Sequence, residues 1–276
     1  MGDWNKISSI DKLLSSLELD SEALTYTLAV TYRPDKKLQI NGLFSSGFRN
    51  PNIDDIGKIR ESNGILLVPN SFLKPEYAYT FESGIKIRSN NQKSYIDIRG
   101  FSTLVSRHIV RSDFIVFSDT STENLNTIIY NGDEVLTQAN KNLGNRFIFG
   151  LCLDGEVSLG NLMKIYGGVN FTSSDKNSDY GPMPSIAPFF GTFTFSSKYR
   201  EWSNFLIWKF SGSKKPVDYS WGGEDGLNET PIVATNEPLE IDRFYGFPSW
   251  NILSLLTQFS LKENIRLTFF YMNLTF

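Results

Sequence analysis

The feature that most constrains this chain is an alternation of apolar and polar residues with a period of two. Short turns and long loops alternate as the connections between these segments. From Leu24 to Tyr32 every second residue is apolar or aromatic, and the residues between them are threonine or alanine. The short turn Pro34–Lys37 follows, and the same pattern resumes from Leu38 to Phe48. Because successive side chains of a β-strand point to opposite faces of its sheet, this period predicts strands with one apolar face.

Ten strands can be placed in this way, and the connections between them alternate without exception. The predicted strands are Ala23–Tyr32, Lys37–Phe48, Pro75–Ser89, Ser94–Val110, Leu136–Leu159, Leu162–Thr172, Pro188–Tyr199, Trp202–Gly212, Ser249–Leu261 and Asn264–Leu274. The long connections cover about Arg49–Lys74, Arg111–Val135, Ser173–Met183 and Ser213–Pro248. Hairpins that are short on one side and long on the other are typical of outer-membrane barrels.

A residue pattern alone does not say whether the apolar face meets lipid or a second layer of protein. A soluble β-sandwich has strands of the same period. The one-sided loop lengths and the charged residues on the opposite face favour lipid. We therefore predict an all-β fold, an antiparallel up-and-down transmembrane β-barrel. The alternative is a soluble β-sandwich that binds carbohydrate through its long loops.

Composition excludes several functional classes. The 276 residues have a net charge of −3 with the two signs interspersed, so we expect no nucleic-acid partner. The single cysteine, Cys152, and the single histidine, His108, exclude an internal disulfide and most Ser/His, Cys/His and multi-histidine chemistry. We expect no catalytic residues, no metal site and no resident cofactor, so the protein is predicted not to be an enzyme. The amino terminus lacks the apolar core of a signal peptide.

Several short motifs resemble TonB-dependent outer-membrane receptors. The sequence GFRNPNIDD at Gly47–Asp55 is similar to a strand end of this family, and VPNSFLKPE at Val68–Glu76 is similar to the start of the next strand. Further similarity lies at Tyr77–Gly84, Gly246–Trp250 and Met272–Thr275. The resemblance extends from about residue 20 to the last residue. It is greatest to the Bacteroidetes-like haem, haemoglobin and siderophore receptor group.

The resemblance implies a 22-stranded barrel with a plug inside it, which imports ligands too large for porins with energy from the TonB complex. We expect residues 1–276 to be a partial barrel domain of about ten strands, without the plug and the final strand, and residues 1–21 to lie in an outer loop. The expected function is that of a fragment of an active-transport receptor for an iron-siderophore, haem or a similar large ligand. The expected location is the outer membrane. The expected partners are outer-membrane lipid, the TonB complex through the missing plug, and the iron chelate or haem.

Arg49 and Glu76 are the candidate site residues of the matched motifs, at the ends of facing strands. One hypothesis gives them contacts in the lumen that shape the ligand vestibule or brace the plug. The other, which we favour, is that they fix where the long loop begins and ends, with Pro51 and Pro75 restricting the backbone.

Three further titratable side chains need an interpretation: His108, Asp54 and Asp55. His108 is expected at the outer end of the next strand, as a surface imidazole in preference to an iron ligand. Asp54 and Asp55 open the long loop, and we interpret them as solvated loop charge because no calcium-binding spacing follows them.

Overall fold

The computed structural model describes residues 23–62, 64–115, 126–176, 181–219, 246–262 and 265–275. The outer loop expected over residues 1–21 lies outside these ranges. The chain divides into two compact units. Unit 1 consists of Met1–Tyr26, Ser46–Tyr79 and Leu104–Arg146, and unit 2 of Thr27–Ser45, Thr80–Thr103 and Phe147–Phe276.

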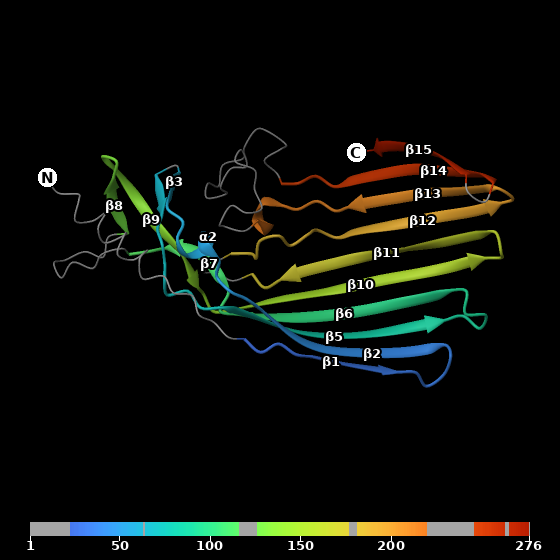
Figure 1. Ribbon diagram of the computed structural model, residues 1–276, viewed down its shortest axis with the longest axis horizontal. Helices are drawn as coiled ribbons and strands as arrows, with labels where there is room; N and C mark the ends of the chain where they lie inside the picture. Colours follow the sequence, from blue (N-terminus) through green and yellow to red (C-terminus); the bar gives the residue numbers. More distant parts are fainter. Residues whose placement is uncertain are drawn as a thin grey trace. The chain divides into compact units, whose positions relative to one another are not determined.

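Ten strands form one sheet in which each strand lies beside the next strand of the ten along the chain (Figure 1). These strands are β1 (Thr27–Tyr32), β2 (Leu38–Arg49), β5 (Glu76–Arg88), β6 (Tyr95–Ser106), β10 (Asn145–Leu159), β11 (Met163–Ser174), β12 (Phe190–Tyr199), β13 (Trp202–Ser211), β14 (Trp250–Lys262) and β15 (Ile265–Thr275). The pairings β1–β2 and β10 through β15 are antiparallel. The predicted antiparallel sheet of ten strands in up-and-down order is therefore confirmed.

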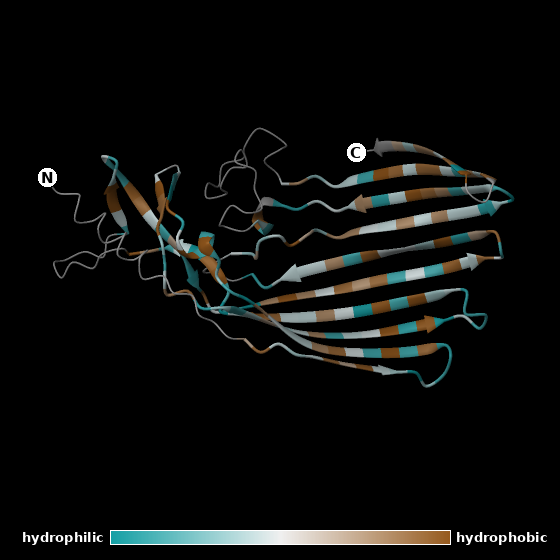
Figure 2. Ribbon diagram, viewed as in Figure 1, coloured by the Kyte–Doolittle hydropathy of each residue, from teal (hydrophilic) through white to brown (hydrophobic). Residues whose placement is uncertain are grey.

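In β10, β11 and β12 of unit 2 one face is apolar and the other is polar, as a period of two produces. The polar face becomes less polar in β13 and β14, where Phe205, Ile207 and Leu256 lie on it. Figure 2 shows the resulting alternation of hydrophobic and hydrophilic residues along strands such as β10. On the apolar face, Leu151 of β10 lies opposite Phe171 of β11, and Phe193 of β12 lies opposite Trp208 of β13. These side chains are 36–50% exposed. An apolar surface of this extent needs an apolar neighbour.

The short turns are stabilised by the residues within them. In the first, the carboxylate of Asp35 accepts hydrogen bonds from the N–H groups of Lys37 and Leu38, at 2.6 and 2.9 Å. In the turn between β10 and β11, Gly160 has a φ of +72°, a conformation that glycine adopts without steric cost. Turn chemistry of this kind is set by neighbouring residues, so it was visible in the sequence.

Two predicted strands are each broken in the structure, and here the prediction was wrong. Instead of one strand over Ser94–Val110, β6 ends at Ser106 and β7 (Ile109–Asp113) begins a second sheet. Instead of one strand over Leu136–Leu159, β9 (Asp133–Asn142) belongs to the second sheet and β10 begins at Asn145.

Both breaks have the same physical cause, a residue in the left-handed region of backbone space. Arg107 has a φ of +57° and Gly144 a φ of +59°, and neither conformation continues a strand. Backbone hydrogen bonds join the two segments at these breaks. The His108 N–H donates to the Gly144 carbonyl at 3.3 Å, and the Leu143 N–H donates to the His108 carbonyl at 2.7 Å.

The second sheet lies in unit 1 and contains five strands: β3 (Arg60–Ser62), β4 (Ile65–Leu67), β7, β8 (Thr127–Tyr130) and β9. β9 is central, pairing in parallel with β4 and antiparallel with β7 and β8. The sheet buries Leu66, Val68, Val135 and Ala139. Parts of the long connections Arg49–Lys74 and Arg111–Val135, predicted without regular structure, are therefore ordered strands.

Unit 1 also contains the short helix α2 (Ile53–Ile56). Its Asn52 side chain accepts a hydrogen bond from the Asp55 N–H, and the Asp55 carboxylate accepts one from the Asn52 N–H, both at 2.9 Å. This reciprocal cap satisfies two N–H groups that a helix start otherwise leaves unpaired. Within the described residues, no helix has the length and hydropathy needed to cross a membrane.

Candidate functional site

Glu76 is the first residue of β5, and its carboxylate accepts three hydrogen bonds in unit 1. Arg49 Nε donates to Oε2 at 2.6 Å, while His108 Nδ1 and the Ile109 N–H lie 2.9 and 2.5 Å from Oε1. Because an ionised carboxylate can only accept, His108 donates from Nδ1. One side chain thus binds the end of β2 and the start of β7.

Arg49 makes a second ion pair, which brings α2 into the same group of residues. Its Nη1 lies 2.7 Å from Oδ2 of Asp55, the oxygen that also accepts the Asn52 N–H. The Asp55 side chain is only 15% exposed, so its interpretation as solvated charge was wrong; Asp54 is exposed, as expected. We call Arg49, Asp55, Glu76 and His108 the Glu76 cluster.

His108 is buried, with 8% of its surface exposed, and the prediction of a surface imidazole was wrong. The break after β6 turns the chain so that the ring contacts Glu76 instead of solvent. Its Nε2 is also buried and has no hydrogen-bond partner among the described residues. Within the same part of the chain, no group of three or more His, Cys, Asp or Glu side chains could hold a metal ion.

The protonation state of Glu76 follows from these contacts. Glu76 belongs to unit 1, whereas β5 from Thr80 onward belongs to the strands of unit 2. Burial raises the pKa of Glu76, but the hydrogen bonds from His108, Arg49 and the Ile109 N–H outweigh it and lower the pKa to about 2. The carboxylate is therefore ionised at neutral pH and is unsuited to general acid–base chemistry.

Three asparagines that sequence reasoning missed attach the segment after Arg49 to β9. Asn70 Nδ2 donates to the Asn140 carbonyl at 2.7 Å, and Asn140 Nδ2 donates to the Asp55 carbonyl at 3.1 Å. Asn142 accepts from the Lys74 N–H and donates to the Lys74 carbonyl, at 2.7 and 2.8 Å. The only available signal was the Asn-Lys-Asn run at 140–142, which says nothing about its partners.

The polar face of unit 2 has charges that neutralise one another from strand to strand. Lys86 of β5 lies 3.6 Å from Asp97 of β6, and Arg99 of β6 lies 2.5 Å from Asp154 of β10. Lys164 of β11 lies 2.7 Å from Glu156 of β10. These side chains therefore brace adjacent strands, and each of these charges has a partner of opposite sign.

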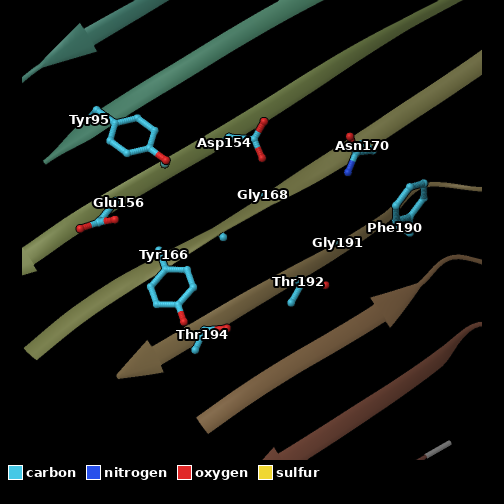
Figure 3. A pocket seen from close by; sticks show the side chains of 12 residues that line it. Tyr95, Asp154, Glu156, Tyr166, Gly168, Asn170, Phe190, Gly191, Thr192 and Thr194 are labelled. Atoms are coloured by element: carbon cyan, nitrogen blue, oxygen red, sulfur yellow. The ribbon is translucent and has the colours of Figure 1, made fainter. Parts of the chain in front are cut away.

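A hollow of about 310 Å³ lies on this polar face (Figure 3). Tyr95, Asp154, Glu156 and Tyr166 line it, and it exists because Gly168 has no side chain there. A Cβ at Gly168 would lie 2.7 Å from the Leu153 carbonyl oxygen, which belongs to the backbone and cannot turn aside, so the position favours glycine. With both carboxylates already paired, the hollow offers hydroxyl and amide groups and no unpaired charge.

An up-and-down run of antiparallel strands, with one exposed apolar face and one face of paired charges, defines a section of the wall of an outer-membrane-type β-barrel. The alternative of a β-sandwich is not supported, because the ten predicted strands form a single sheet instead of two. The chain belongs to the TonB-dependent receptor family: the family model "TonB dependent receptor-like, beta-barrel" matches residues 2–274. The resemblance noted in the sequence is thus confirmed.

Individual proteins of known name share only low sequence identity with this chain. The hemoglobin and hemoglobin-haptoglobin-binding protein of Haemophilus ducreyi is 25% identical over 163 residues, which are 58% of this chain and 16% of that protein. The siderophore receptor PirA from Acinetobacter baumannii has a TM-score of 0.66 and 15% identity over 88% of this chain and 36% of its own. The ferric enterobactin receptor PfeA from Pseudomonas aeruginosa has a TM-score of 0.66 and 14% identity, covering 88% and 34%.

At these identities the structural likeness shows the fold and not the ligand. The chain spans about a third of the length of the two solved receptors and less of the curated relative. The members of this family are outer-membrane transport receptors, and the family is not an enzyme family.

Proposed function

We propose that this chain forms part of the barrel wall of an outer-membrane receptor that takes up an iron-siderophore, haem or a similar large ligand with TonB energy coupling. The observation that supports this most is the ten-strand sheet in chain order, which the family model matches over residues 2–274. The relatives named above are a haemoglobin-binding protein and two siderophore receptors, which is why iron-bearing ligands are proposed.

The proposed partners follow from the two faces of unit 2. Leu151, Phe195 and Leu206 of the apolar face are 50%, 37% and 42% exposed, and outer-membrane lipid is the neighbour that suits them. The opposite face, with its paired charges, suits an aqueous lumen. The TonB complex is the proposed source of energy, as in the family.

For the Glu76 cluster we propose a structural role, that of fixing the long segment after β2 against the start of β7. Both Glu76 oxygens accept hydrogen bonds from within unit 1, and Arg49 donates to Glu76 and Asp55. These groups would have to give up strong contacts to bind a ligand. The geometry therefore supports the loop-fixing hypothesis over direct contact with a ligand.

Heterologous uptake tests the proposed function. The complete receptor that contains this sequence is expressed in a bacterial strain without its own outer-membrane iron receptors. Haemin, haemoglobin or ferric enterobactin is then supplied as the sole iron source. We expect growth on at least one of these sources, and no growth in the matched strain that lacks TonB. Receptor present in the outer membrane without growth on any of the three would contradict iron uptake, and growth without TonB would contradict the coupling.

A further inference from the structure

Two glycines leave adjacent positions vacant on the apolar face of unit 2. Gly155 of β10 and Gly167 of β11 are directly opposite each other in the register. Each has the parity of the apolar side chains next to it in its strand, such as Leu153 and Val157 in β10 and Ile165 in β11. An otherwise continuous apolar surface therefore has a gap two residues wide.

This gap is a hollow of about 220 Å³. The apolar side chains of four strands that line it are Ile96, Leu153, Val157, Ile165 and Phe193. We call it the apolar socket. It lies on the opposite side of the sheet from the polar hollow of Figure 3, at the same level of β10 and β11.

The glycines themselves are explained by close approach of the backbone. A Cβ at Gly167 would lie 2.1 Å from the Thr192 carbonyl oxygen, and one at Gly155 would lie 3.1 Å from the Tyr95 carbonyl oxygen. Side chains at these two positions are thus disfavoured by the strands beside them. The socket follows from this packing, and the described side chains leave it unfilled.

We propose that the apolar socket seats one acyl chain of an outer-membrane lipid. An empty apolar space forfeits dispersion contacts along its whole lining, and a water molecule there would lack the polar partners it needs. The socket is continuous with the exposed apolar face, whose chemistry matches hydrocarbon. A flexible acyl chain can enter a space that neither glycine can fill. This inference goes beyond ligand uptake, although it relies on the membrane location that we propose.

Anomalous diffraction locates such a chain directly. The complete receptor is crystallised from bicelles of phosphatidylcholine that is brominated on one acyl chain, and data are collected at the bromine edge. We expect a bromine peak inside the socket, stronger than any over the apolar surface around Phe195 and Leu206, which lie outside the lining. Bromine peaks elsewhere on the apolar face but none in the socket would overturn the proposal.

A matched pair of variants separates the socket from the general lipid surface. Val157→Phe places a larger side chain at the rim of the socket, whereas Leu159→Phe makes the same kind of change on the same face of β10, outside the lining. The two wild-type side chains are 50% and 44% exposed. We expect the bromine peak to fall roughly twofold or more in Val157→Phe, because the space is occupied, and to persist in Leu159→Phe.

An undiminished peak in Val157→Phe would overturn the proposal. Failure of the wild-type receptor to enter bicelles at all would instead contradict its proposed function. Correct insertion without a bromine peak in the socket would contradict only the lipid seat, so the two failures are distinguishable.

Discussion

At the scale of single residues, Glu76 joins three segments of unit 1: the end of β2, the start of β5 and the start of β7. Its carboxylate is 11% exposed and holds a guanidinium, an imidazole and a backbone N–H from two other segments. Hydrogen bonds to charged groups are about twice as strong as those between neutral groups. When one partner is removed, the other charge stays buried without a partner, and this destabilises the folded state. Glu76, which the sequence placed only at a strand end, therefore contacts three groups from two other segments.

Replacing Glu76 by Gln tests this dependence. The amide retains one acceptor but leaves Arg49 and His108 without the carboxylate, so we expect unit 1 to lose about 2 to 4 kcal/mol of stability. The measurement is the rate of limited proteolysis within residues 50–74 in the complete receptor, which should rise. Glu82→Gln on the same strand is the control, since Glu82 has no ion pair among the described residues. Equal proteolysis of the two variants would contradict the role given to Glu76.

The low pKa of Glu76 also predicts a pH dependence. Its folded value is about 2, against an ordinary value of 4.5. Because the folded state holds the proton more weakly, the carboxylate stabilises unit 1 fully above about pH 4.5, and this stabilisation is lost as the pH falls towards 2. We expect exchange of the Ile109 amide hydrogen, corrected for its intrinsic rate, to accelerate across this window and not between pH 7 and 5. In Glu76→Gln this acceleration of exchange between pH 4.5 and 2 should be absent. If it persisted, a titratable group other than Glu76 would be its cause.

At the scale of elements, the second sheet of unit 1 depends on Thr137 in its central strand. Thr137 is fully buried, and its Oγ1 lies 2.5 Å from the Phe114 carbonyl and 3.1 Å from the Asn126 carbonyl. Its backbone also exchanges hydrogen bonds with these two residues. One side chain therefore joins the point where the chain leaves β7 to the point where it enters β8.

Thr137→Val keeps the size of the side chain and removes its hydroxyl. The Phe114 carbonyl then loses the hydroxyl as its donor, while the Asn126 carbonyl keeps the Thr137 N–H at 2.7 Å. We expect this loss to cost about 1 to 3 kcal/mol. Faster hydrogen exchange in β7 and β8 of the complete receptor, with no change in β13, would show this loss. Thr127→Val at the start of β8 is the matched control, because no hydrogen bond of the Thr127 hydroxyl is found in the described structure. Indistinguishable exchange in the two variants would remove Thr137 from this role.

At the scale of the whole molecule, the two faces of the ten-strand sheet decide what surrounds the chain. Apart from the apolar socket, the apolar face extends from β10 to β14, with pairs such as Phe193 opposite Trp208 and Leu206 opposite Leu255. The rings of Phe193 and Trp208 stack with their centroids 5.9 Å apart. Such a surface is stable against lipid and prone to aggregate in water.

Adjacent residues on β12 test which face meets lipid. Phe195 lies on the apolar face, and Ser196 lies on the polar face opposite Phe205. An arginine facing the middle of a bilayer costs about 2 to 4 kcal/mol, so Phe195→Arg should lower the fraction of receptor that resists heat denaturation in outer-membrane preparations. Ser196→Arg should have a much smaller effect. The reverse order would show that the faces are assigned the wrong way round.

The sequence by itself determined the ten strands, their order and their two faces. Each of these depends on neighbours in the chain: the period of two decides which face a side chain joins, and residues such as Asp35 and Gly160 close the short turns. The family resemblance followed from motifs that are equally local, including the one that contains Arg49.

Only the tertiary structure decided what the long connections do. The second sheet, the burial of His108 and the pairing of Asp55 all depend on segments that are distant in the sequence; Asn140 and Asp55, for example, are 85 residues apart. Strands as short as β3 and β4 have too few residues to show a period, and the left-handed residue that ends β6 is an arginine, which gives no sign of its conformation. Hydrogen bonds between such segments are fixed by the folded chain as a whole, because no short stretch of sequence contains both partners.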